Sequence, residues 1–305
     1  MEQITLKELN DYIDDFKEVL NFLSFKNFEM PVMLSYRNLW SSITPGIDSS
    51  IKTLEGIKQL LAISNFVDIY VLLRKLRDNL FFDCVIAQDA ESNHPNLTDV
   101  FFKPFVNEDG SLILSKVEDA LRSFVIDNIV YELDNQDKDR IEKWKNNEIR
   151  KTDNKKDKWV GYFEFKCKLE NNALIKKAND LFLDKHLSSL QRVTNSYVHT
   201  LTFDKSNNYS KTNEEHIKQI YRFLRTIKVS IISYLMLIKS RIFSSSDYLD
   251  ALDAGETPIE GSQYWIAPLI QDELKEIKII NKKLYYFLKR HNTNSMDFGD
   301  GEFDA

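Results

Sequence analysis

The chain of 305 residues contains 43% hydrophobic and 29% charged side chains and has a formal net charge of −6. This length suits one large domain or two ordinary ones, and the hydrophobic fraction is enough for a sizeable core. The negative charge excludes a basic nucleic-acid surface over the whole molecule. A local basic patch is still compatible with it, because net charge hides the distribution of charges.

Glycine and proline are scarce, with 8 and 6 residues, so the composition favours long helices over a β-protein with many tight turns. No GxGxxG or GxxxxGK[ST] sequence occurs, and a glycine-rich nucleotide-binding loop is therefore not expected. Cys84 and Cys167 are far apart and belong to no CxxC pair. We expect two reduced, buried thiols, without a disulfide framework or a zinc site.

The first eight residues, Met-Glu-Gln-Ile-Thr-Leu-Lys-Glu, lack the apolar segment of a signal peptide. The longest apolar run, Val229 to Ile238, contains polar residues and is shorter than the about 20 residues that a bilayer requires. These features predict a soluble cytoplasmic protein with no membrane partner, in which this run is part of a core helix.

The chain begins with apolar residues at helical spacing over 5–24, where Thr5 and Glu8 have the pattern of a capping box. Residues 25–46 are less regular, and Thr-Pro-Gly at 44–46 marks a turn. The first element is therefore expected to be a helix that is followed by an irregular segment.

A long helical pattern occupies about 50–90, and a break near Asn65 divides it in two. Residues 91–110 are expected to form a loop, followed by an amphipathic helix over about 115–134. The strongly charged stretch 135–158 is too polar for a core and is interpreted as a solvated helix end with a mobile loop.

The segment Trp159–Lys168 alternates weakly and is expected to be a short strand or an extended segment. Three further helices are expected over 172–200, 213–243 and 266–290. A loop over 244–263 separates the last two, and the acidic tail over 293–305 is expected to be mobile. Because no repeat and no linker between two cores is visible, residues 1–305 are predicted to form a single all-α domain.

The helix expected over 172–200 ends with Arg192-Val-Thr-Asn195-Ser-Tyr197-Val-His199. Arg192 and His199 are seven positions apart, nearly two helical turns, so both side chains leave the same face. Asn195 lies between them on that face. A guanidinium, an amide and a titratable imidazole in one row form a combination that can act on a phosphodiester.

These residues resemble the HEPN superfamily, whose members are up-and-down helical bundles. Many are metal-independent RNases marked by an arginine, four to six intervening residues and a histidine near a helix end, as in Arg192 to His199. The run Leu72–Asn79 is similar to the arginine-bearing first long helix of abortive-infection relatives. Val193 departs from the pattern, because a polar residue follows the arginine in many active members. The resemblance covers about 50–90 and 172–290, with about 92–170 as a partly irregular insertion.

The resemblance implies cleavage of RNA by attack of the ribose 2′-OH on phosphorus, which leaves a 2′,3′-cyclic phosphate. His199 would be the general base or acid, and Arg192 would stabilise the charge on the phosphorane oxygens. Asn195 would fix the imidazole or bind a phosphate oxygen, and Tyr197 is a candidate for stacking on a base. Arg74 and Arg77 are further candidates for substrate binding.

A single histidine cannot easily act as both base and acid, and HEPN proteins commonly dimerise so that two motifs face one cleft. The resemblance therefore implies a homodimer that acts on RNA in a bacterial defence or toxin–antitoxin setting. An antitoxin or another defence-system protein is a candidate partner. No metal and no cofactor are expected, since no histidine or cysteine spacing indicates a ligand set.

Each feature also has an ordinary structural explanation. His199 can be a helix-end histidine, Arg192 a surface arginine and Asn195 a polar helix residue. Arg74 and Arg77, together with the neighbouring aspartate, can form an internal ion pair that steadies two packed helices. The competing functions are therefore a non-catalytic HEPN-like binding module, such as an antitoxin partner, nucleotide sensor or assembly subunit, and a helical scaffold unrelated to nucleic acid.

Overall fold

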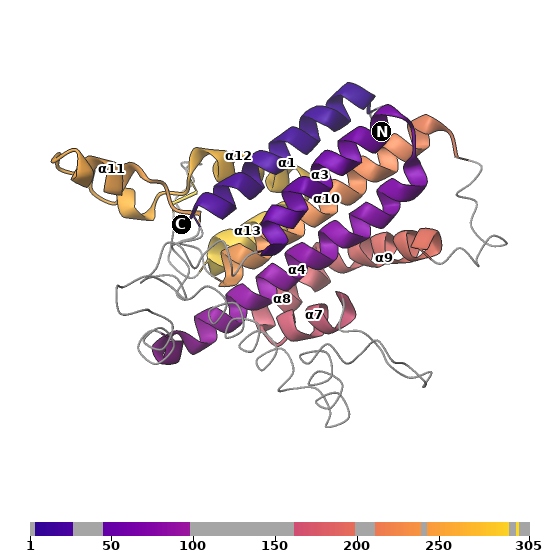
Figure 1. The fold of residues 1–305 in the computed structure, drawn as a ribbon. Coiled ribbons are helices and arrows are strands. Elements are labelled where there is room, and N and C mark those ends of the chain that lie inside the picture. Colours follow the sequence, from indigo (N-terminus) through magenta and orange to yellow (C-terminus); the bar gives the residue numbers. More distant parts are fainter. Residues whose placement is uncertain are drawn as a thin grey trace, which may run out of the picture.

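A computed structural model describes residues 4–26, 45–97, 162–198, 211–238, 243–292 and 297–298. As predicted, the described chain is all-α, with helices packed around a shared hydrophobic core (Figure 1). Within those ranges, β-type pairing is limited to isolated bridges, Ser244 with Ile266 and Trp265 with Asp297.

The described helices differ widely in length, from single turns to the 32 residues of α4. In chain order they are α1 Leu6–Lys26, α3 Pro45–Ala62, α4 Phe66–Leu97, α7 Tyr162–Leu169, α8 Ala173–Ala178, the π-helix η5 Asn179–Leu183, α9 Asp184–Val198, α10 Asn213–Ile238, α11 Asp247–Asp253, the 3₁₀-helix η8 Ser262–Tyr264, α12 Pro268–Ile280 and α13 Lys282–His291.

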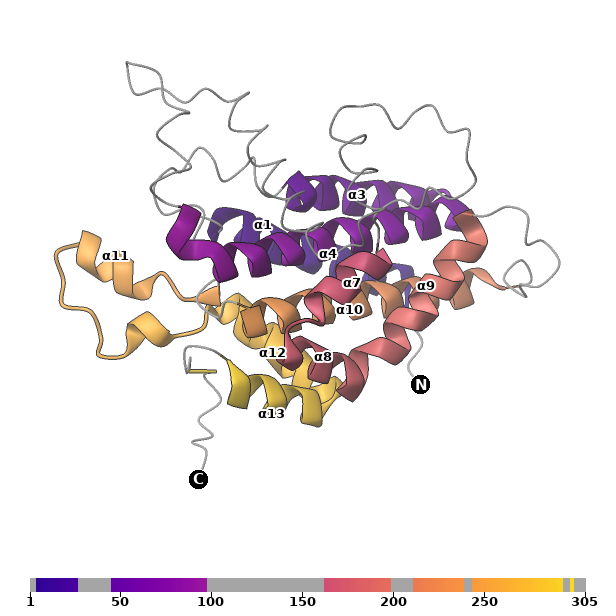
Figure 2. The same cartoon turned by 90° about the horizontal axis from the view of Figure 1, so that it is seen from below.

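Long helices α1, α3, α4 and α10 lie side by side, and α9 packs against α4 and α10 (Figures 1 and 2). Ring contacts of Tyr70 with Phe223 and of Phe81 with Tyr234 show that α4 and α10 run parallel. Helix α11 projects away from the bundle (Figure 1). The arrangement places α4 and α10 at the centre, with α9 along one side of the pair.

Two capping boxes define the starts of α1 and α10. The backbone N–H of Glu8 donates to Thr5 Oγ1 at 3.2 Å, and that of Thr5 donates to Glu8 Oε2 at 2.7 Å, which confirms the predicted box. Thr212 and Glu215 exchange the same pair of bonds before α10, at 3.3 and 2.8 Å. Side chains that satisfy the first N–H groups explain why both helices begin where they do.

The predicted break near Asn65 is confirmed. Helix α3 ends at Ala62, Ser64 has a φ of 55°, and Asn65 accepts a bond from the backbone N–H of Asp68 at 3.4 Å. Pro45 and Gly46, where a turn was expected, instead begin α3, and proline suits the first helical turn. The segment therefore forms two helices, α3 and α4, and the first begins at Pro45, five residues before the predicted start at about residue 50.

Other boundaries differ from the predictions. Residues 162–168 of the expected extended segment belong to α7, and the expected loop over 244–263 contains α11 and η8. The last helix is divided at Asn281, whose backbone is extended and whose side chain caps α13 by accepting from Leu284 N at 3.0 Å. Helix α4 continues to Leu97, into the expected loop.

The acidic tail was predicted to be mobile, but its described residues are bound to the core. Asp297 N donates to the Tyr264 carbonyl at 3.0 Å, and Ile266 N donates to the Asp297 carbonyl at 3.3 Å. The Phe298 ring is 3% exposed and packs edge-on against Tyr285. The expected helix at 115–134, the charged stretch 135–158, most of the insertion 92–170 and His199 lie outside the described residues.

The second half of α10 is buried on all sides, which confirms that the apolar run near its end is a core helix. Within the described ranges, neither α10 nor any other helix has the length and apolar character of a membrane span. Lys228 is nevertheless 2% exposed there. Its Nζ lies 2.7 Å from Glu273 Oε1, 3.4 Å from Glu276 Oε2 and 4.1 Å above the Tyr12 ring, so it joins α10 to α12 and α1.

Replacing Lys228 with Ala should lower the free energy of unfolding by about 3–5 kcal/mol, because it leaves the buried Glu273 carboxylate without its cation. The double variant Lys228→Met/Glu273→Leu should recover most of that loss, since it removes both charges. Chemical denaturation measures the difference.

The matched control is Lys275→Ala, whose side chain is 64% exposed and pairs with Asp272 on the surface of α12. It should change the free energy of unfolding by less than about 1 kcal/mol. Equal destabilisation by the Lys228 and Lys275 replacements would contradict a structural role for the buried pair.

Candidate functional site

Polar side chains from α4 and α9 meet in a line that we call the α4–α9 seam: Arg74, Arg77 and Asp78 on α4, and Gln191 and Asn195 on α9. The Arg77 guanidinium donates from Nε and Nη2 to Asp78 Oδ1, at 2.9 and 2.6 Å. Its Nη1 donates to Gln191 Oε1, and Gln191 Nε2 donates to Asn195 Oδ1 at 3.2 Å. Arg74 Nε lies 3.8 Å from Asp78 Oδ2.

Arg77, a candidate for substrate binding, is fully buried within this seam. All five donors of an arginine need partners when water is excluded, and Asp78 and Gln191 satisfy part of that need. The structure therefore has the internal ion pair that the sequence left open, with Arg77 holding α9 against α4. Arg74 keeps 33% of its side chain exposed and is accessible from solvent.

Tyr197, the other candidate for contacting RNA, is 5% exposed and stacks on Tyr70 with ring centroids 4.2 Å apart and planes 12° apart. The Tyr70 hydroxyl donates to Gln219 Oε1 at 2.7 Å and lies 3.0 Å from His216 Nδ1. Phe66 stacks on His216 at 4.5 Å. In this arrangement Tyr197 belongs to an aromatic cluster and offers no free face to a base.

The sequence did not identify His216 as a site residue. Nothing near it in the sequence links it to α4, and only the packing of α10 along α4 brings it to Tyr70. Burial lowers its pKa below the usual range, the charge of Lys211 lowers it further, and Glu215 partly opposes both. The neutral imidazole has one ring N–H, and Nδ1 is placed to donate to the Tyr70 oxygen, whose own proton goes to Gln219.

On the solvent side of α9, away from the buried Leu187 and Leu190, the residues Lys185, Ser188 and Arg192 are exposed. Lys185 and Arg192 are seven positions apart and so share a face. Residues 185–198 contain no aspartate or glutamate. Arg192, a predicted site residue, is therefore exposed to solvent. Asn195 lies beside it, is half-buried, and accepts a hydrogen bond from Gln191 in the α4–α9 seam. His199 follows the last described residue of α9.

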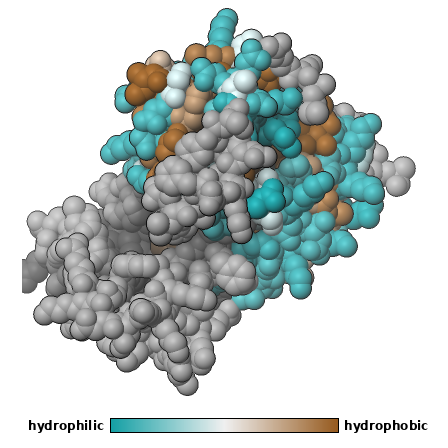
Figure 3. All heavy atoms as spheres, turned by 90° about the vertical axis from the view of Figure 1, so that its right-hand side faces the viewer, coloured by the Kyte–Doolittle hydropathy of each residue, from teal (hydrophilic) through white to brown (hydrophobic). Residues whose placement is uncertain are grey.

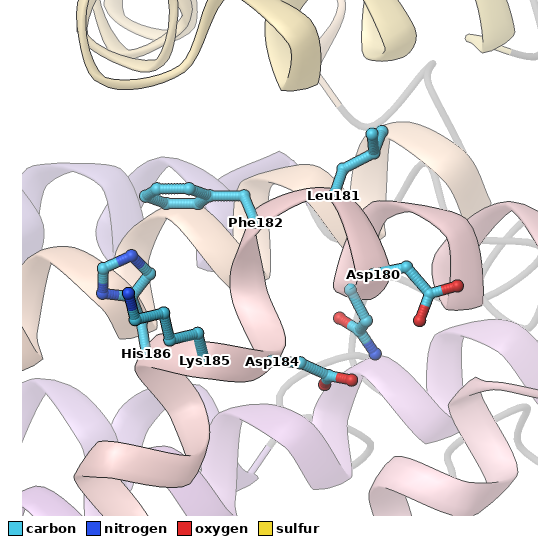
Figure 4. Close-up of a pocket in the computed structure, with 7 residues that line it drawn as sticks. Asp180, Leu181, Phe182, Asp184, Lys185 and His186 are labelled. Atoms are coloured by element: carbon cyan, nitrogen blue, oxygen red, sulfur yellow. The ribbon is translucent and has the colours of Figure 1, made fainter.

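A pocket with a volume of about 540 Å³ opens where α8 continues through η5 into α9 (Figure 4). Its lining residues are Asn179, Asp180, Leu181, Phe182, Asp184, Lys185 and His186. A single π-turn inside a helix is uncommon and often marks a functional site. The helical pattern over 172–200 is continuous in the sequence and does not indicate this turn.

A chain of polar contacts that begins in the core at Tyr234 and ends at the partly exposed Lys166 fixes this π-turn. Asn179 is 1% exposed and accepts from the Tyr234 hydroxyl at 2.7 Å, and its Nδ2 donates to Glu170 Oε1 at 2.8 Å. Lys166 Nζ lies 2.7 Å from Glu170 and 3.0 Å from Asp184. Burial alone lowers the pKa of Lys166, but these two carboxylates raise it overall, so the lysine stays charged.

The Phe182 and His186 rings lie on one side of the pocket, with centroids 4.5 Å apart and planes 42° apart (Figure 4). Burial lowers the pKa of His186, and the charges of Arg222, Lys185 and Arg225 lower it further. Lys185 of α9 and Arg222 and Arg225 of α10 therefore surround an imidazole that is neutral at pH 7. Among the described residues, no cluster of histidine, cysteine, aspartate and glutamate side chains is arranged to hold a metal ion.

Comparisons of the chain with protein families, with curated proteins and with solved structures gave no match. The structural features that bear on function are the α4–α9 seam, the exposed face of α9 and the pocket at η5.

Replacing Arg77 with Met should lower the free energy of unfolding by about 3 kcal/mol or more, because Asp78 and Gln191 lose their buried partner. Arg74→Met, at a partly exposed position on the same helix, should cost less than about 1 kcal/mol. Thermal and chemical unfolding test this. If Arg77→Met leaves stability intact, the bracing role assigned to Arg77 is wrong.

The His216 ring should titrate with a midpoint below 6.5, since burial disfavours its charged form. The neutral His216 ring contributes fully to folding stability above pH 6.5, the pKa of an unperturbed histidine. This contribution declines as the pH falls from 6.5 toward the lower pKa of the folded state. NMR titration of the ring measures the midpoint. Glu215→Gln should lower it further and Lys211→Met should raise it, because each removes one neighbouring charge. A midpoint at or above 6.5 would contradict the assignment.

Proposed function

We propose that the protein is a metal-independent endoribonuclease of the HEPN type, acting in bacterial defence or in a toxin–antitoxin system. The observation that supports this most directly is the state of Arg192. It is exposed on the part of α9 after Asp184, where residues 185–198 contain no carboxylate, beside Asn195, which the α4–α9 seam holds in place. A fixed guanidinium of this kind can bind a phosphate without competition from acidic side chains of the same segment.

In the proposed reaction, the ribose 2′-OH attacks the adjacent phosphorus, and the 5′ oxygen leaves with a proton. The Arg192 guanidinium would bind two non-bridging oxygens as charge develops on them. His199, seven positions further along the chain, would transfer the proton. Asn195 would orient the imidazole or a phosphate oxygen. A second copy of the chain would supply the second imidazole, so the proposal includes a homodimer.

Arg77 and Tyr197 were expected to contact RNA, but this proposal gives them a structural role. Both are buried, so they would act by positioning α9 and not by touching RNA. Arg74 is the one of the two arginines on α4 with enough exposure for a direct contact.

The alternative function is a non-catalytic HEPN-like binding module, an antitoxin partner, nucleotide sensor or assembly subunit. The burial of Arg77 and the stacking of Tyr197 on Tyr70 favour it, since they remove two candidate substrate contacts from the surface. Such a module would bind through the same face of α9 without cleaving.

Purified protein should cut a fluorescent single-stranded RNA, or transfer RNA, in the presence of EDTA. The new 3′ ends should be 2′,3′-cyclic phosphates, as shown by their resistance to ligation until the phosphate is removed. Arg192→Ala and His199→Ala should each reduce the rate about 100-fold or more. Denaturing gels report both the rate and the cleavage position.

The matched controls are Arg290→Ala and His291→Ala, an arginine and a histidine at the end of α13. They should leave the rate unchanged. Absence of cleavage by the wild-type protein, or equal activity in the Arg192 and His199 variants, would refute the nuclease proposal and leave the binding module.

A further inference from the structure

The pocket at η5 and the exposed face of α9 form one continuous surface. Lys185 lines the pocket and is also the first cation of the face that continues to Arg192. Seven residues of helix span about 10 Å, roughly the rise of three stacked nucleotides. The pocket therefore lies within a few nucleotides of a phosphate bound at Arg192.

The neighbouring surface of α10 has the same sign of charge. From His216 to Thr226 the helix contains Lys218, Arg222 and Arg225 and no carboxylate. Arg222 is exposed and Arg225 half-buried, and both are near enough to His186 to lower its pKa. In a chain with a net charge of −6, this is a local concentration of cations. Hydrophilic side chains also cover much of the described surface at the end of the bundle where α10 begins (Figure 3).

We propose that the pocket at η5 binds a base of single-stranded RNA against the Phe182 and His186 rings, while Lys185 and Arg222 bind the adjoining phosphates. This inference rests on the proposed action on RNA and adds a binding site away from Arg192. Proteins that bind single strands combine cations along the backbone with aromatic side chains that stack on bases.

The charged side chains that line the pocket indicate on which side the base would lie and on which side the phosphates would lie. Asp180 and Asp184 line it as well, and in Figure 4 both lie on the side away from the two rings. Asp184 is paired with Lys166, whereas Asp180 is exposed. A phosphate would be repelled at that side, but an uncharged base with N–H donors would not. The phosphates therefore belong on the side of Lys185 and Arg222.

The test measures binding and not cleavage. A fluorescent RNA of six nucleotides with 2′-O-methyl groups cannot be cut by 2′-OH attack, and its anisotropy gives the Kd at a fixed salt concentration. Phe182→Leu keeps an apolar side chain at a position that contacts the core but removes the aromatic ring. Lys185→Glu reverses an exposed charge. Each should weaken binding about tenfold.

Two controls match these variants. Phe287→Leu changes a phenylalanine that contacts His291 four residues later on α13, with ring centroids 4.6 Å apart, as Phe182 contacts His186 on α9. Lys52→Glu reverses an exposed charge on α3. Both should leave the Kd within about twofold of the wild-type value. Adenosine monophosphate alone should bind much more weakly than the six-nucleotide RNA, because it cannot reach both the pocket and Arg192.

Unchanged binding by Phe182→Leu and Lys185→Glu, or equal weakening by the controls, would overturn the inference, as would equal affinity for the mononucleotide. These outcomes are separable from failure of the nuclease proposal. If unmodified RNA is not cut but the modified RNA binds through the pocket, the binding site stands and the catalytic assignment fails. If RNA is cut at Arg192 and His199 while the pocket variants bind normally, only the site at η5 is wrong.

Discussion

The second half of α10 has no side in contact with water, and this constraint determines much of the rest of the structure. Thr226 and Ser230 donate to carbonyl groups of α10 itself, but its buried lysine and tyrosine need partners from neighbouring helices, because an unpaired buried polar group costs several kcal/mol. Lys228 donates to the Glu273 carboxylate on α12, and the Tyr234 hydroxyl donates to the Asn179 side chain in the π-turn. The same polar contacts that satisfy α10 therefore fix the positions of α12 and of the turn before α9.

A second set of buried contacts then orients α9 itself. Arg77 reaches from α4 to Gln191, and Tyr70 stacks on Tyr197, six residues further along α9. Contacts at both places prevent rotation of α9 about its axis. Once the buried side is fixed, the helical period decides that Lys185 and Arg192 emerge on the solvent side. The chemistry proposed for the surface thus depends on residues that no ligand touches.

Local signals in the sequence were enough to predict the helical class, the cap at Thr5 and Glu8, and the break at Asn65. Features that depend on tertiary contacts were not predictable. The sequence around Arg77 is compatible both with an arginine that binds RNA and with a buried arginine. Only the packed structure shows that this arginine contacts Asp78 and Gln191. His216 was overlooked for the same reason. The division at Asn281 had a local signal, a capping asparagine between two apolar runs, which periodicity outweighed.

The π-turn at η5 adds one residue to an otherwise regular helical path. The wider turn absorbs that residue, so beyond it Leu187 and Leu190 face the core and Lys185 and Arg192 face solvent. Deletion of one residue within the turn would let it close as a regular α-helical turn and would keep this phase. Deletion of one residue just after Asp184 would instead rotate all later side chains of α9 by about 100°. A shorter chain is therefore tolerated at the π-turn and not in the helix that follows it.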